Sequence, residues 1–379
     1  MEYRRFGKTN KMVSVITLGG MRYKHSNSEP RDQIPSDALD QCRETVEKAL
    51  QQGINLIESA WGYGKSEHLY GRVLNDELKI ARSSYFLMTK GGAKTAEEMR
   101  KMVSLQLKAL KTDYIDFYAW HGINTLELLN IACAKDGPVE ELLKLKEEGV
   151  IGHVGFSTHA PLDVIMKAIS TDLFDFVNLH YYYFFQRNKP AVDLAAAKEM
   201  GVFIISPNDK GGKLFNAPQK LKDLTSPLHP LQWNARFCLG HKSIHTLTFG
   251  LTTASQFELL NGIFPAPAPM AHDDARIKVL LDNQKQMVPF ADFDTYCMEN
   301  DPSGLNIPEI LRFRTLWKCY DMKEFGLYRY NMFQEKDHWF PGNFPTEENL
   351  KMIDLTKCPD GIPLVDLIRE THDGLYRPK

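Results

Sequence analysis

Between about residue 14 and residue 262, short runs rich in β-branched and aromatic residues alternate with longer segments of helical periodicity. This alternation constrains the fold more than any other feature of the chain. The strand-like runs are VSVITLGG, INLIES, YFLMTK, YIDFYAW, HVGFST, FDFVNLH, VFIISP and IHTLTFG. The helical segments between them include 39–52, 95–110, 139–148, 161–169 and 190–200, whose lengths suit right-handed crossovers between parallel strands.

Eight such units predict a (β/α)8 TIM barrel of the α/β class. A doubly wound sheet shows the same alternation, but no GxGxxG motif opens the first helix, and this absence favours the barrel. A turn at residues 7–10 separates the short runs 3–6 and 12–15. We therefore expect a hairpin that caps the bottom of the barrel.

Strand signals stop in the last part of the chain. Beyond about residue 277 the sequence is irregular and helical, with helices expected over 309–320 and 364–372. We predict two domains, a barrel over 1–276 and a mostly helical extension over 277–379.

Composition narrows the class of partner. The chain has 379 residues, 43% of them hydrophobic, and a formal net charge of -2, with both signs mixed throughout. Such a chain buries a sizeable core but has no basic stripe for nucleic acid and no polybasic membrane patch. No run of about 18 apolar residues occurs either. We expect a cytoplasmic enzyme that acts on a small molecule, and its oligomeric state stays open.

The cysteines are scattered and form no CxxC pair. They are Cys42, Cys133, Cys238, Cys297, Cys319 and Cys358. This spacing indicates reduced structural thiols rather than a disulfide framework or a metal site.

Titratable side chains gather at consecutive strand ends. Glu58 ends the second strand, Lys90 the third and His121 the fourth, and Tyr63 follows the second strand in GINLIESAWGYGKSE. In a barrel the active site lies at the carboxyl ends of the strands, so the four side chains converge on one mouth. An acid, a phenol, an amine and an imidazole together make a proton-transfer site.

These residues carry a resemblance to a family. GINLIESAWGYGKSE, followed by one strand ending in Lys90 and another ending in His121, resembles the aldo-keto reductase superfamily, whose pattern reads GxxxxDTAxxYGxSE. The resemblance implies hydride transfer between a nicotinamide and a carbonyl or alcohol. Tyr63 is then the proton donor, with its pKa lowered by the Lys90 ammonium, and His121 positions the substrate oxygen.

One position departs from the family pattern. Glu58 stands where the family has aspartate, and it keeps the charge but adds a methylene. Because catalytic geometry tolerates little displacement, this change bears directly on activity.

The resemblance also supplies cofactor contacts, position by position. HVGFSTH matches the carboxamide-binding run, with Thr158 in place of the usual asparagine, and FVNLHYYYF has an asparagine where glutamine is usual. The segments IISPNDKGGKL and TFGLTTASQF match a pyrophosphate-covering loop and an adenine-end segment. The cofactor-binding candidates are Gly20, Met21, Ser157, Asn178, Ser206, Asn208, Lys210, Gly211, Gly212, Thr252 and Gln256. Because related enzymes mostly use NADP, NADP(H) is expected over NAD(H).

The tail resembles a bacterial ferredoxin domain of the kind appended to one subgroup of the superfamily. Its segments CMENDPSGLNIPEI and KCPDGIPLVDLI share the end of the cluster motif C-x2-C-x2-C-x3-C-P. The expected ligand positions hold Ala291, Asp294, Cys297, Asp301, Glu348, Lys351, Asp354 and Cys358. Since iron–sulfur clusters need thiolate ligands, we predict a ferredoxin-like scaffold without a cluster.

Substrate contacts are the least specified part of the site. The candidates are one cation just beyond the first strand, two rings that flank catalytic candidates, and one ring of the aromatic run after the sixth strand: Arg22, Trp61, Trp120 and Tyr181. Rings of this kind stack against a sugar or an aromatic ligand, and ordinary barrel packing is the other interpretation.

Three functions remain open on the sequence. The leading hypothesis is a nicotinamide-dependent oxidoreductase acting on a sugar-like or natural-product-like carbonyl. The alternatives are a cofactor-binding redox sensor or partner subunit with little turnover, and an isomerase that uses bound nicotinamide for internal redox chemistry.

Overall fold

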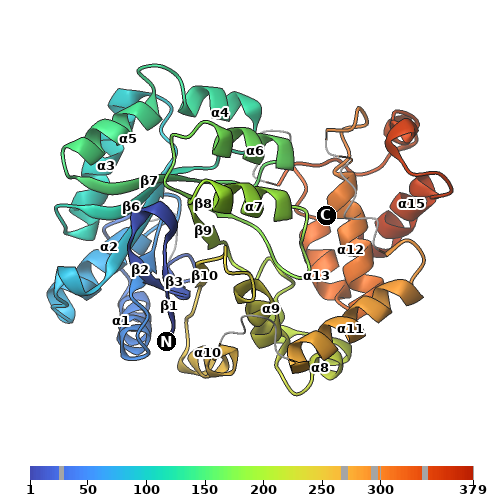
Figure 1. Cartoon of the computed structure of the whole chain (residues 1–379), viewed down its shortest axis with the longest axis horizontal. Coiled ribbons are helices and arrows are strands. Elements are labelled where there is room, and N and C mark those ends of the chain that lie inside the picture. Colours follow the sequence, from blue (N-terminus) through green and yellow to red (C-terminus); the bar gives the residue numbers. More distant parts are fainter. Residues whose placement is uncertain (25–29, 266–271, 292–297, 299, 335–339, 379) are drawn as a thin grey trace. The chain divides into compact units, whose positions relative to one another are not determined.

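The structure is a computed structural model, and it describes residues 1–24, 30–265, 272–291, 298, 300–334 and 340–378. The chain forms two compact units, and Figure 1 labels most of their elements. The first unit consists of Met1–Tyr181, Asn188–Pro207 and Cys238–Pro269. The second consists of Tyr182–Arg187, Asn208–Phe237 and Met270–Lys379, so it includes segments that the sequence analysis counts with the barrel.

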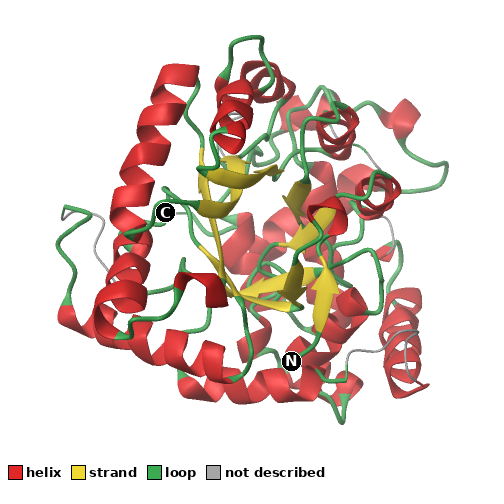
Figure 2. Ribbon diagram, turned by 60° about the vertical axis from the view of Figure 1, so that its left-hand side comes forward, coloured by secondary structure: helices red, strands yellow, loops and turns green. Residues whose placement is uncertain are grey.

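The first unit is built on a closed barrel of parallel strands, as predicted. Its strands are β3 (Ile16–Gly19), β4 (Leu56–Glu58), β5 (Phe86–Gly91), β6 (Ile115–His121), β7 (Ile151–Ser157), β8 (Phe176–Leu179), β9 (Gly201–Ile204) and β10 (Thr246–Phe249). Each strand pairs with its neighbours in chain order, and β10 closes the ring on β3. Figure 2 shows these strands in yellow.

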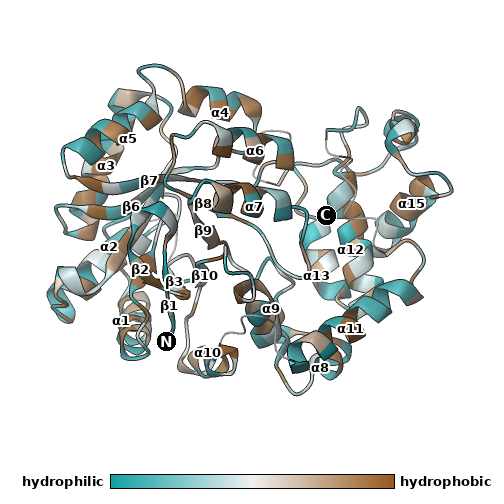
Figure 3. Cartoon of the chain, viewed as in Figure 1, coloured by the Kyte–Doolittle hydropathy of each residue, from teal (hydrophilic) through white to brown (hydrophobic). Residues whose placement is uncertain are grey.

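The helices of this unit follow the barrel strands along the chain. They are α1 (Ser36–Gln51), α2 (Ser66–Gly71), α3 (Ala96–Leu110), α4 (Leu126–Ala132), α5 (Pro138–Glu147), α6 (Leu162–Ser170), α7 (Lys189–Ala197) and α10 (Ala254–Leu260). Helix α3 begins at a side-chain cap, because the Thr95 hydroxyl accepts a hydrogen bond from the Glu98 amide. Figure 3 shows apolar and polar residues alternating along α3 and α5, the pattern of helices packed on one face.

A hairpin contributes to the bottom of the barrel core, as expected from the turn at residues 7–10. β1 (Tyr3–Arg5) pairs antiparallel with β2 (Met12–Ser14), and a 3-10 turn joins them. Phe6 is fully buried and packs edge-to-face on Phe117 of β6, with ring centroids 5.2 Å apart. Gly7 has φ +53°, and a Cβ there would lie 2.3 Å from the Glu199 carbonyl oxygen, so only glycine fits.

The described part of the second unit is helical. Its helices are α8 (Gln219–Thr225), α9 (Pro230–Leu239, whose last residues belong to the first unit), α11 (His272–Met287), α12 (Ile307–Tyr320), α13 (Lys323–Tyr330), α14 (Glu347–Lys351) and α15 (Leu364–Leu375). α12 and α15 contain the helices predicted in the tail. No helix among the described residues has the length and apolar character needed to cross a membrane.

The ferredoxin-like scaffold stays a prediction. Of the expected ligand positions, Asp294 and Cys297 lie outside the described residues. Cys358 is described and only partly buried, and its Sγ lies 4.0 Å from the Ile362 carbonyl oxygen.

Candidate active site

The strand register directs three of the four catalytic candidates into the barrel. Glu58 is the last residue of β4 and His121 the last of β6, and Lys90 lies one residue before the end of β5. Side chains alternate along a strand, so each of these residues shares a face with a core residue two or four positions earlier. Those residues, Leu56, Met88 and Phe117, belong to the buried barrel core.

Tyr63 is brought to the same place by the loop after β4. The Ser59 and Trp61 amides donate to the carbonyls of Met88 and Lys90, each at 2.8 Å, and so continue the β4–β5 pairing into the loop. The Tyr63 amide then turns back to the Ala60 carbonyl at 2.9 Å. The loop therefore brings the Tyr63 side chain back to β5, where its hydroxyl contacts Lys90.

The four side chains are therefore brought together as predicted, and three of them form a closed set of contacts. Lys90 Nζ forms a buried ion pair with Glu58 Oε1 and donates to the Tyr63 hydroxyl at 3.0 Å. The Tyr63 hydroxyl in turn donates to Glu58 Oε1 at 3.2 Å. The His121 ring lies edge-on to the Tyr63 ring, with centroids 6.2 Å apart.

The acidity of Tyr63 differs from the sequence expectation. Burial raises the pKa of Tyr63, the Glu58 carboxylate raises it further, and together they outweigh the lowering by Lys90, so the pKa is about 12. The prediction of a lowered pKa was wrong because it counted the ammonium without the burial and the carboxylate. Burial alone lowers the pKa of Lys90, but contacts with Glu58 and Tyr63 reverse this and raise it to about 12.

The extra methylene of Glu58 is accommodated by its neighbours on β3 and β10. Thr248 Oγ1 lies 3.4 Å from Glu58 Oε2, and a Cβ added at Gly19 would lie 3.2 Å from the same oxygen. Glu58 itself is 3% exposed. One carboxylate oxygen thus serves Lys90 and Tyr63, while the other lies against a glycine and a threonine that the sequence analysis did not single out.

Two cofactor candidates lie side by side in the barrel wall. Ser157 of β7 pairs in register with Asn178 of β8, and both are buried. The Asn178 Oδ1 atom is buried and accepts no hydrogen bond from the residues that the structure describes. Such an unmatched acceptor has the chemistry to receive an amide N–H group. Thr158, by contrast, uses its hydroxyl locally, donating to the Ile123 carbonyl at 2.6 Å.

Other cofactor candidates of the first unit have structural surroundings of their own. A Cβ at Gly20 would lie 2.2 Å from Ser66 Oγ, so close packing explains that glycine. Met21 is 61% exposed. The Thr252 amide donates to Gln256 Oε1 at 2.7 Å, which fixes the start of α10. Ser206 has φ +49° and is partly exposed.

The predicted pyrophosphate loop lies in the second unit. There Asn208 Oδ1 accepts from the Phe215 amide at 2.8 Å, and Lys210 is partly exposed. Gly211 and Gly212 are both buried, and a Cβ at Gly212 would lie 1.8 Å from Met322 Cε. Close packing against Met322, the N-cap residue of α13, therefore explains the glycine at position 212. The role of Gly212 in cofactor binding stays a prediction.

The substrate candidates differ in exposure. Trp61 is partly exposed, and the Arg31 guanidinium lies 4.0 Å from its ring centroid. Arg22 is exposed beside Gly250. Trp120 lies on the opposite face of β6 from His121, is 1% exposed, and donates its Nε1 proton to the Ala93 carbonyl. Tyr181 is 2% exposed, with its hydroxyl 3.1 Å from His241 Nε2. These two rings therefore serve packing, which was the other interpretation of the pattern.

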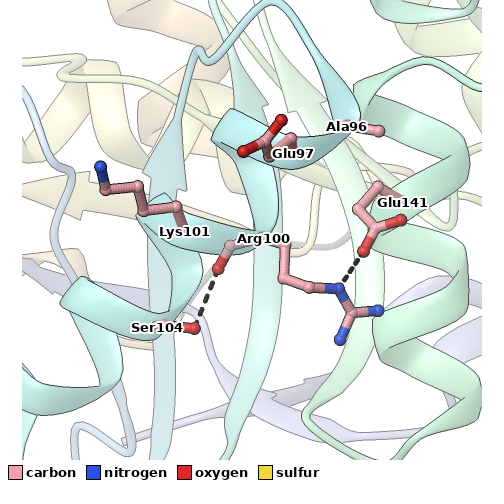
Figure 4. A pocket seen from close by; sticks show the side chains of 6 residues that line it. All are labelled: Ala96, Glu97, Arg100, Lys101, Ser104 and Glu141. Atoms are coloured by element: carbon pink, nitrogen blue, oxygen red, sulfur yellow. Dashed lines mark hydrogen bonds and ion pairs between the residues drawn. The ribbon is translucent and has the colours of Figure 1, made fainter.

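A separate surface pocket of about 420 Å³ is lined by Ala96, Glu97, Arg100, Lys101, Ser104 and Glu141 (Figure 4). It lies over α3 and α5, and its Arg100 guanidinium is neutralised by ion pairs with Glu141 and Glu148. The pocket contains none of the catalytic candidates. Among the residues that the structure describes, no cluster of three or more His, Cys, Asp or Glu side chains is placed to hold a metal ion.

Comparisons with known proteins agree with this geometry. The family model described as the aldo/keto reductase family matches residues 15–238. D-arabinose 1-dehydrogenase of Saccharomyces cerevisiae is 32% identical over 161 residues, which cover 40% of this chain and only 45% of the yeast enzyme. An uncharacterized oxidoreductase of Bacillus subtilis, YqkF, is 24% identical over 324 residues, covering 76% of this chain and 97% of that protein.

Solved structures show the same fold. The holo form of an aldo-keto reductase from Bacillus halodurans superposes with a TM-score of 0.60 at 22% identity, covering 74% of this chain and 96% of that chain. At this identity the likeness establishes the barrel fold alone.

Proposed function

The chain belongs to the aldo/keto reductase family, and we propose that it is a nicotinamide-dependent reductase in which Tyr63 is the proton donor. Family membership implies NAD(P)H-dependent reduction of carbonyl compounds. The single observation that supports the assignment of Tyr63 is its hydroxyl contact with Lys90, which is itself paired with Glu58 inside the barrel.

The side chains divide the chemistry between them. When bound, the nicotinamide supplies the hydride to the substrate carbon. Tyr63 supplies the proton to the substrate oxygen, and Lys90, which donates to the Tyr63 hydroxyl, stabilises the phenolate that remains. Glu58 keeps Lys90 charged and oriented, and we assign to His121 a hydrogen bond to the substrate oxygen.

The residues present fit the nicotinamide. The unmatched Asn178 Oδ1 is an acceptor for the carboxamide N–H group, and Ser157, its neighbour in the sheet, supplies a hydroxyl beside it. We propose that these two residues hold the carboxamide, and that NADP(H) is preferred to NAD(H). The remaining cofactor contacts, including Lys210 and the glycines after it, stay predictions.

The substrate class is a small carbonyl or alcohol compound, and we propose a sugar-like or natural-product-like one. Trp61 supports this proposal, because it is the partly exposed ring in the loop that carries Tyr63. No partner protein is required by this chemistry.

The function is tested by cofactor consumption. Purified protein is incubated with NADPH or NADH and a panel of aldoses, ketones and aromatic aldehydes, and absorbance at 340 nm is followed together with tryptophan fluorescence. Consumption with at least one carbonyl supports the reductase. Fluorescence quenching without consumption across the panel contradicts it and supports a cofactor-binding sensor instead, while product formation with no net change in bound nicotinamide indicates an isomerase.

Glu58→Asp tests whether the longer acid has become part of the site. Shortening the side chain withdraws its carboxylate from Lys90 Nζ and the Tyr63 hydroxyl together, so we expect kcat/KM to fall about 10- to 100-fold. The measurement is kcat/KM on the same carbonyl for both proteins. Equal or higher activity in the aspartate variant contradicts this expectation and shows that the glutamate is merely tolerated.

The tail is expected to hold no iron–sulfur cluster. Cysteine occupies only two of the predicted ligand positions, Cys297 and Cys358, and a cubane of this type takes four thiolates. Protein produced anaerobically with iron and sulfide should contain no stoichiometric iron and should not absorb near 400 nm. The variant with both cysteines changed to serine should keep its turnover. A brown protein with acid-labile sulfide would overturn this prediction.

A further inference from the structure

A buried polar network lies directly behind the catalytic side chains and is not part of the proposed chemistry. Its centre is Gln106 of α3, which is fully buried. The Gln106 Nε2 atom lies 2.6 Å from Glu67 Oε1, 3.1 Å from the Lys90 carbonyl oxygen and 3.3 Å from Thr89 Oγ1. The Gln106 Oε1 atom accepts from the Tyr118 hydroxyl at 2.7 Å.

The network joins the two segments that carry Tyr63 and Lys90. Glu67 lies on α2, which begins three residues after Tyr63, and Thr89 directly precedes Lys90 on β5. The Thr89 hydroxyl donates to Glu67 Oε1 at 2.5 Å. Gln106 therefore connects the helix that follows the tyrosine loop to the backbone of the lysine.

The network contacts the catalytic residues through the Lys90 backbone carbonyl. This carbonyl accepts the Trp61 amide at 2.8 Å as well as the Gln106 amide. Gly91 and Gly92 follow directly along the chain, so few side chains remain to hold this end of β5. Two donors on one carbonyl fix the backbone from which the Lys90 side chain extends.

The orientation of the Gln106 amide is set by its partners. A backbone carbonyl and a carboxylate oxygen only accept hydrogen bonds, so the amide nitrogen faces Lys90 and Glu67, and its oxygen faces the Tyr118 hydroxyl. Each of these polar groups thus has a matched donor or acceptor. A satisfied buried network of this kind specifies one arrangement of the elements that it joins.

We propose that Gln106 and Glu67 are positioning residues that hold the Tyr63 hydroxyl against Lys90 Nζ. The proposal rests on the proposed function, because it concerns the same proton donor. Neither residue touches the substrate in this assignment. Their removal should therefore lower the rate of the chemical step without changing the binding of cofactor or carbonyl.

The principal test is Gln106→Met, which keeps the volume and removes the hydrogen bonds. We expect kcat to fall about 10-fold, while KM for the carbonyl and Kd for NADPH stay within about twofold. The companion pair is Glu67→Gln and Glu67→Met. The glutamine keeps an acceptor for Thr89 and should retain kcat within about threefold, whereas the methionine should lose as much as Gln106→Met.

The control is Asn55→Leu at the opposite end of β4. Asn55 Oδ1 accepts from the Ser14 amide at 2.7 Å, and its Nδ2 donates to the Met12 carbonyl at 2.9 Å, so this variant loses a comparable tether between strands. It should lose stability in urea and keep kcat. A folded Gln106→Met protein with unchanged kcat, or an equal loss of kcat in Asn55→Leu, overturns the proposal.

A readout without turnover separates this proposal from the proposed function. In protein labelled at the tyrosine ζ carbon, the Tyr63 resonance is assigned by its loss in Tyr63→Phe. Gln106→Met should shift that resonance and Asn55→Leu should not. If the wild type reduces no carbonyl, the proposed function fails, while an unshifted resonance in Gln106→Met overturns the positioning role. If Gln106→Met does not fold, Gln106→Asn, which withdraws the amide by one methylene, takes its place in each measurement.

Discussion

Replacement of Tyr63 by phenylalanine is expected to lower kcat about 100- to 10,000-fold while Kd for NADPH stays unchanged. The Tyr63 hydroxyl contacts both Lys90 and Glu58 and carries the proton that is transferred. The substitution removes this hydroxyl and leaves the aromatic ring in place. The measurement is steady-state reduction of a carbonyl identified with the wild type, together with fluorescence titration by NADPH. Tyr3→Phe, at an exposed hydroxyl on the N-terminal hairpin, is the matched control.

The pH dependence of the wild type provides a second check on Tyr63. Because burial and Glu58 raise its pKa to about 12, the proton donor stays protonated throughout the neutral and mildly alkaline range. The rate of reduction should show no loss of the Tyr63 proton up to pH 10. A phenol of ordinary acidity would already be half ionised there, since its pKa is about 10. A halved kcat at that pH, absent in the phenylalanine variant, would show a phenol of ordinary acidity at Tyr63 and contradict its raised pKa.

Lys90→Met should abolish most turnover and also destabilise the fold. The change leaves the Glu58 carboxylate buried, with a phenol as its nearest remaining donor, and breaking a buried ion pair costs about 3–5 kcal/mol. Urea unfolding at pH 7 measures the free energy of unfolding, and carbonyl reduction measures the rate. Lys94→Met, at an exposed lysine four positions further along the chain, is the control and should change neither quantity.

The choice of pH 7 follows from the direction of the pKa shift. The contacts of Lys90 raise its folded-state pKa from 10.5 to about 12. Its contribution to stability is therefore complete below the ordinary lysine pKa and disappears only as the pH rises through about 12. Lys90→Met and the wild type should accordingly differ in stability by the same amount at pH 6 and pH 8. An unfolding free energy equal to that of the wild type at pH 7 would refute the prediction.

The sequence predicted the barrel because strand and helix periods alternate strongly, and the same pattern located Glu58, Lys90 and His121 at strand ends. It did not predict the acidity of Tyr63. That value depends on burial and on a glutamate long enough to reach the hydroxyl, and both follow from packing in three dimensions. Gln106 also gave no signal, since a glutamine on an amphipathic helix is ordinary in sequence. Its importance comes from the carbonyl that it reaches on β5.

For Trp120 and Tyr181 the sequence suggested a role in the site, whereas in the structure both side chains are buried. Trp120 stands next to a catalytic candidate in the chain, and Tyr181 belongs to the aromatic run after the sixth strand. Both positions suggested substrate contact, but adjacent residues on a strand face opposite sides. Trp120 follows that rule and packs away from the barrel interior. Tyr181 comes after the end of β8, where strand alternation no longer applies, and its contact with His241 is set by the fold.

The closure of the barrel has a consequence for synthesis of the protein. β3, near the start of the chain, finds one of its two partners only in β10, so the ring stays open until residue 249 has emerged from the ribosome. Thr248 of that last strand is also a neighbour of Glu58 Oε2, and a Cβ at Gly19 of the first strand would lie 2.7 Å from Thr248 Oγ1 and 3.2 Å from the same carboxylate oxygen. The surroundings of Glu58 are therefore complete only when β10 pairs with β3. In a nascent chain that stops before β10, the edges of β3 and β9 are unpaired and the site lacks Thr248. The pairing of β10 with both strands closes the barrel and completes the site at the same time.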